Sequence, residues 1–160
     1  MSANTDRLLA YIHQLWAGSH RIPAQLIHFH PVAHLLLLPD LTDDIKDWLA
    51  NALLPHLADV PDTNAIIFIS EAWAVKLPPG APLDYLPRAR EHPDRREIIN
   101  AMIYTPTSTT MVTWFIDRTT TPPTISPTPT IHKEDIKPPK DDPSTFCNPF
   151  AAAHPAPYPN

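Results

Sequence analysis

The chain has 160 residues and a formal net charge of -5 at pH 7, which gives room for one ordinary domain. Because the chain is mildly acidic and has no basic stripe, we expect it to bind neither nucleic acid nor a membrane. With only 2 glycines and one cysteine, it can form no Rossmann turn, no P-loop and no internal disulfide. No other cofactor motif is present, so we expect no cofactor.

The first 64 residues predict two helices separated by a strand region. Apolar side chains recur at helical spacing after a cap at Asn4 or Thr5, and this first helix ends near Gly18. The segment Leu26 to Leu38 has strand character, but Pro31 interrupts it, so Val32 to Leu38 is its better part. A second helix begins after a Thr42 cap, and Pro55 ends or kinks it. The two apolar stripes consist of Leu8, Tyr11 or Ile12, Leu15 and Trp16, and of Ile45, Trp48, Leu49 and Leu53.

Three further strands follow. Ala65 to Val75 is apolar on both faces, as expected of a central strand. Residues 77–96 form a long proline-rich connection, and Glu97 to Thr105 and Thr110 to Arg118 predict an antiparallel hairpin. A helix lies between the first two strands, which favours a parallel pair. The order α-β-α-β-β-β predicts a small α/β (α+β) domain over residues 1–118, with a mixed sheet of about four strands and two helices.

Residues 119–160 hold 11 of the 22 prolines and predict an extended or disordered arm. Its last part carries spaced aromatic residues around an Asn-Pro-Phe tripeptide. Such side chains can dock in the groove of a protein partner, and the alternative is a solvated linker. The candidate partner-binding residues are Phe146, Asn148, Pro149, Phe150 and Tyr158.

The most unusual polar feature is Glu71, a carboxylate near the end of the apolar central strand. A buried carboxylate is costly unless it is paired, and Arg95 or Arg96, just before the next strand, could form an ion pair that Trp73 covers. In the catalytic alternative, Glu71 and Asp94 act as acid and base and His92 carries the proton in a hydrolase. We favour the structural reading, because the sequence supplies no oxyanion hole, nucleophile partner or phosphate cradle.

The segments Ser70-Glu71-Ala72-Trp73 and His92-Pro93-Asp94-Arg95, with Glu97, resemble motifs in a group of small uncharacterised proteins from bacteria and their phages. Asp117-Arg118 after the last strand also fits this group. The resemblance covers about residues 30–118 and none of the arm. It implies a fold and a phage or prophage origin, but no reaction. The turn at Pro106 to Thr109 departs from the group, which usually has glycine there.

His28 and His30 lie at i, i+2, so in an extended segment they share one face. Two imidazoles on one face could bind zinc, with Asp40 or His56 as a third ligand. Nine histidines in 160 residues also produce such pairs by chance, and we therefore expect no metal site.

Taken together, these features favour a non-enzymatic accessory or interaction protein that binds a protein partner, or its own copies, partly through the arm. The single cysteine, Cys147, and a start, Met1 to Asp6, with no basic region followed by an apolar stretch predict an intracellular (cytoplasmic) or virion-associated protein without a signal peptide.

Overall fold

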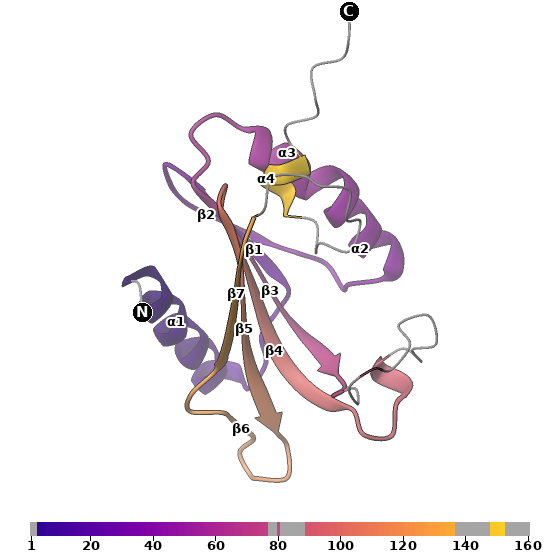
Figure 1. Ribbon diagram of the computed structural model, residues 1–160. Helices are drawn as coiled ribbons and strands as arrows, with labels where there is room; N and C mark the ends of the chain where they lie inside the picture. Colours follow the sequence, from indigo (N-terminus) through magenta and orange to yellow (C-terminus); the bar gives the residue numbers. More distant parts are fainter. Residues whose placement is uncertain (1–2, 77–79, 81–88, 137–147, 153–160) are drawn as a thin grey trace, which may run out of the picture. The chain divides into compact units, whose positions relative to one another are not determined.

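The computed structural model describes residues 3–76, 80, 89–136 and 148–152 (Figure 1). These residues belong to two units. Unit 1 comprises Met1–Ile22, Ser70–Asn100 and Thr113–Thr130, and unit 2 comprises Pro23–Ile69, Ala101–Val112 and Ile131–Asn160. The boundary between the units therefore falls within four of the strands.

The described residues form helices and the strands of an antiparallel sheet. They are α1 (Ala3–Ser19), β1 (Gln25–His30), β2 (Val32–Leu37), α2 (Asp43–Trp48), the π-helical turn η1 (Leu49–Leu53), α3 (Leu54–Asp59), β3 (Ala65–Ala74), the 3-10 turn η3 (Ala89–Glu91), β4 (Arg96–Tyr104), β5 (Ser108–Asp117), β6 (Thr124–Ile125), β7 (Thr130–Asp135) and α4 (Pro149–Ala152). The seven strands have the order β2-β1-β3-β4-β5-β6, and β7 also pairs with β5. The mixed α and β class is confirmed, but the sheet is larger than the predicted four strands.

One reason for the larger sheet is Pro31, which divides the predicted first strand into the hairpin β1–β2. Proline has no N–H to donate, so the chain reverses there instead of continuing as one strand. This extra reversal also makes the expected parallel pair wrong: β3 lies beside β1 and runs antiparallel to it, with Leu26 opposite Phe68.

The second reason is the proline-rich segment after residue 118, where the structure differs from the predicted extended arm. Ile116 pairs with Ile125 of β6, and the Ile136 amide donates to the Thr107 carbonyl at 2.8 Å just after β7. Short threonine- and isoleucine-containing stretches between the prolines have strand propensity and satisfy backbone groups along β5. Part of the predicted arm is thus a part of the sheet.

In unit 1, α1 buries the predicted apolar stripe. Leu8, Ile12 and Trp16 are almost fully buried. The helix ends where His20 adopts a positive φ of 53° while its amide donates to the Trp16 carbonyl at 2.8 Å, a common C-terminal cap. The Trp16 indole N–H donates to the Pro123 carbonyl at 3.1 Å and so fastens the helix to the segment after β5.

In unit 2, the core gathers side chains from six elements. Thr42 caps α2 as predicted, because its hydroxyl accepts from the Ile45 amide at 3.3 Å. Pro55 does not end the helical segment but lies in the first turn of α3, after the wider π turn η1, where its missing N–H is tolerated. The buried cluster consists of Leu26, Leu49, Leu54, Ile66, Met102, Tyr104 and Phe150, each worth about 1.5–3 kcal/mol when buried.

No described helix has the length and apolar character that a membrane crossing demands.

Candidate functional site

The polar cluster predicted around Glu71 exists in unit 1, but its cation is Arg118. One Glu71 oxygen, Oε1, accepts from the Ile22 amide at 2.8 Å, and the other, Oε2, lies 3.7 Å from Nη2 of Arg118. Nε of Arg118 also donates to Oε2 of Glu97 at 2.7 Å. Arg118 therefore bridges two carboxylates that are both partly exposed. The expected pairing of Glu71 with Arg95 or Arg96 is not formed.

Hairpin geometry explains why Arg118 takes this place. β4 and β5 are neighbours joined by three residues, so the end of β5 lies beside the beginning of β4. That position sets Arg118 against Glu97. The sequence carries a signal for the contact between Arg118 and Glu97, because the second strand of the predicted hairpin ends at Arg118 and the first begins at Glu97.

Arg95 and Arg96 instead lie against aromatic rings. The Arg95 guanidinium is 5.1 Å from the centre of the Trp73 ring, and that of Arg96 is 3.9 Å from the Phe115 ring. Trp73 is 43% exposed and contacts Arg95, whereas the guanidinium of Arg118, the partner of Glu71, lies 5.8 Å from the centre of the Trp16 ring. These contacts are cation–π interactions, worth about 0.5–1 kcal/mol at exposed sites.

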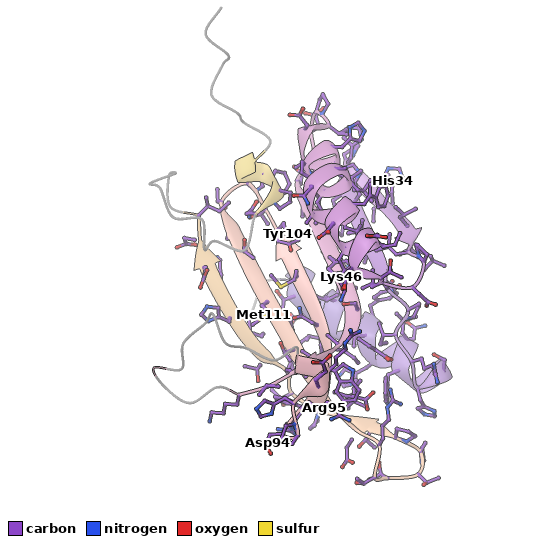
Figure 2. All side chains as sticks on the ribbon, turned by 90° about the vertical axis from the view of Figure 1, so that its right-hand side faces the viewer. His34, Lys46, Asp94, Arg95, Tyr104 and Met111 are labelled. Carbon is purple, nitrogen blue, oxygen red and sulfur yellow. The ribbon has the colours of Figure 1, made fainter. Side chains whose placement is uncertain are left out.

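The proposed acid–base set of Glu71, His92 and Asp94 is not assembled. Nδ1 of His92 accepts from the Asp94 amide at 3.0 Å, and the His92 carbonyl accepts from Nη1 of Arg95 at 3.2 Å. Figure 2 shows Asp94 and Arg95 close together in the turn before β4. His92 thus stabilises its own turn, while Glu71 is engaged by Ile22 and Arg118.

An open groove beside this cluster is lined in part by Arg95, Arg96 and Arg118 and by Glu97 and Asp117. The Thr119 hydroxyl and amide donate to the Asp117 carboxylate and lower its pKa, so this group stays ionised. The two carboxylates offset two of the three positive charges. The groove is therefore not strongly selective for an anion.

The histidine cluster lies in unit 2. The rings of His28 and His30 are stacked with centres 5.8 Å apart, and His34 lies 6.4 Å from His28. Nε2 of His28 bonds the Thr63 hydroxyl at 2.8 Å, and that hydroxyl donates to the Leu57 carbonyl. In the described part of the chain, no three His, Cys, Asp or Glu side chains are placed to hold a metal ion. The suggested zinc set with Asp40 or His56 is therefore not formed among these residues.

The candidate partner-binding residues of the arm fall into two groups. Phe146 and Tyr158 lie outside the described residues. Asn148, Pro149 and Phe150 are buried in unit 2, where α4 packs against α3 (Figure 1). These three are engaged within the chain rather than presented to a partner.

Among the described residues of unit 2, exposed apolar side chains gather on β2, a predicted strand whose sequence does not indicate this exposure. All six of its residues are exposed, including Val32 at 64%, Leu35 at 56%, Leu36 at 46% and Leu37 at 63%. β2 is the end of the strand order, and among the described strands only β1 pairs with it. Its other edge therefore presents free backbone N–H and C=O groups. Figure 2 shows His34, from this strand, near the outer margin of the drawing.

Comparisons with protein-family models, with curated proteins and with solved structures found no match.

Proposed function

We propose that this chain is a non-enzymatic interaction protein whose binding surface is the edge strand β2. The carrying observation is the exposure of all six β2 residues on a strand that lies at the end of the sheet. Monomeric proteins protect such edges with charged residues, prolines or bulges. β2 contains no charged residue and no proline between Val32 and Leu37.

The binding mode that suits such an edge is strand addition. In this mode an extended segment of a partner forms backbone hydrogen bonds with the free edge, and alternate side chains supply specificity. The leucines of β2 supply apolar contact on both faces of the added strand. This surface replaces the arm residues Asn148 to Phe150, which are already buried in unit 2.

The geometry does not favour the hydrolase alternative, because the Glu71 carboxylate is engaged by Ile22 and Arg118 and the His92 ring accepts from the Asp94 backbone amide. A phage or prophage origin, and a role in a virion or in the host cell, belong to the proposal only through the resemblance of the two motifs.

The test is capture from source cells by the full-length chain, compared with two variants. Leu35→Lys together with Leu37→Lys adds charges to the free edge, and Ile131→Lys is the matched control on β7, where Ile131 is 41% exposed. The proposal expects wild type and control to retain the same bound protein and the double variant to lose it. A double variant that retains every interaction would show that β2 is not the binding surface.

A further inference from the structure

The geometry points to a second copy of this chain as the occupant of the β2 edge, which rests on the proposed function and names its partner. The inference begins with the hydrogen-bond pattern of the hairpin. The Leu38 amide donates to the Ala24 carbonyl at 2.9 Å, and β1 and β2 continue this register with Leu26 opposite Leu36. Antiparallel strands alternate between pairs that exchange hydrogen bonds and pairs that do not.

This alternation decides which backbone groups point away from β1. Counting by twos from Leu38, Leu36 and His34 bond to β1. The amides and carbonyls of the residues between them, Ala33, Leu35 and Leu37, therefore point to the free edge. The outward groups are spaced evenly and have Leu35 at their centre.

The outward-pointing backbone groups of Ala33, Leu35 and Leu37 can form hydrogen bonds with the same groups on a second copy of the strand. If a second copy is rotated about a two-fold axis through Leu35, its strand runs antiparallel and Leu35 meets Leu35. Ala33 of each copy then meets Leu37 of the other, and each of these pairs exchanges two backbone hydrogen bonds. No insertion or bulge is needed to complete this pairing.

Side chains and charges agree with a second copy. The facing pairs on one side of the joined sheet are Leu35 with Leu35 and Ala33 with Leu37, all apolar, and no like charges meet along β2. The antiparallel arrangement also brings the end that leads to Asp40 towards the hairpin end of the other copy, which carries His30. No like charges therefore meet at these ends. We therefore infer a dimer in which two β2 strands join two sheets.

Sedimentation equilibrium of the full-length chain tests the inference, with circular dichroism to verify folding. Wild type and Ile131→Lys should be dimeric. Leu35→Lys should be folded, because this side chain is already 56% exposed, and should raise the dimer dissociation constant at least about tenfold. Leu35→Glu should do the same, and an equimolar mixture of the two variants should recover a dimer, because opposite charges then face each other at the axis.

The outcomes separate this inference from the proposed function. A monomeric wild type, or a Leu35→Lys variant that dimerises as well as wild type, overturns the dimer. So does an equimolar mixture that stays monomeric. If wild type is monomeric but captures another protein that the Leu35→Lys, Leu37→Lys variant loses, the proposed function stands without the dimer. If that capture is also unaffected, both are wrong.

Discussion

Replacing Asn148 by alanine should weaken the fold of unit 2, because this side chain fastens α4 to the β4–β5 turn. The Asn148 amide nitrogen, Nδ2, lies 3.1 Å from the carbonyls of Thr105 and Ser108 and 3.0 Å from the Thr109 hydroxyl. Its oxygen accepts from the Phe150 amide at 2.9 Å. Asn148 is only 6% exposed, so water does not readily replace these bonds.

The magnitude follows from which groups lose their partners. The Ser108 carbonyl still accepts from the Thr105 amide at 2.9 Å, so its loss is small. The Phe150 amide and the Thr105 carbonyl lose the side chain that satisfies them, and an unsatisfied buried polar group costs about 1–3 kcal/mol. We expect Asn148→Ala to lower the free energy of unfolding by about 2–4 kcal/mol. Phe150→Ala, which empties a core position that is 5% exposed, should cost about 3–5 kcal/mol.

Urea denaturation of the full-length chain measures both changes as a lower midpoint at an unchanged slope. Asn51→Ala is the matched control, because Asn51 is exposed on η1, and it should stay within about 0.5 kcal/mol of wild type. If Asn148→Ala and Phe150→Ala also stay within that range, the Asn148–Phe150 segment does not contribute to the fold. Its role as a partner-binding segment would then return to consideration.

Three further predictions concern the polar groups. Glu71→Ala should lower the free energy of unfolding by about 1–2 kcal/mol, because the Ile22 amide loses its acceptor. Glu71→Gln should lower it by less, because an amide oxygen still accepts this hydrogen bond. Equal losses for the two variants in urea denaturation would contradict this prediction. Burial, and then the charges of His30 and His34, lower the pKa of His28 below its ordinary 6.5. The unfolded chain therefore binds this proton more readily, and stability that is present above pH 6.5 should decline as the pH falls towards 5. Thermal unfolding at both pH values should show a smaller decline in His28→Gln, and an unchanged decline would contradict the assignment. Thr105→Val should lower the free energy of unfolding by about 1 kcal/mol in urea denaturation, because the Thr105 hydroxyl accepts from the Ser108 and Thr107 amides at 3.0 and 3.3 Å. A change near zero would show that these hydrogen bonds do not stabilise the turn.

Local patterns predicted the elements whose formation depends on nearby residues. The stripe of Leu8, Ile12 and Trp16 identifies α1 because helix periodicity sets these side chains on one face. Thr42 identifies the beginning of α2 because a hydroxyl at that position satisfies a free amide. The strand signals near β3, β4 and β5 are equally local.

The Pro106 turn shows that a hairpin can form without the glycine that usually marks such a turn. Its sequence, Pro106-Thr-Ser-Thr, contains no glycine and lacks the Asn-Gly signature of a tight hairpin turn. In the structure, the Thr105 hydroxyl accepts from two following amides and so organises the turn without a residue of positive φ. The polar side chain replaces the conformational freedom that glycine would supply.

Pairing partners were decided by tertiary structure, because they depend on contacts between residues far apart in the chain. No local pattern distinguishes Arg118 from Arg95 as the partner of Glu71, since the choice follows from the geometry of the β4–β5 hairpin. Phe150 looks like an exposed anchor in a proline-rich segment, but it becomes a core residue because α4 packs on α3. The open backbone edge of β2 likewise follows from strand order: in a central strand both edges would be paired, whereas β2 lies at the end of the described sheet.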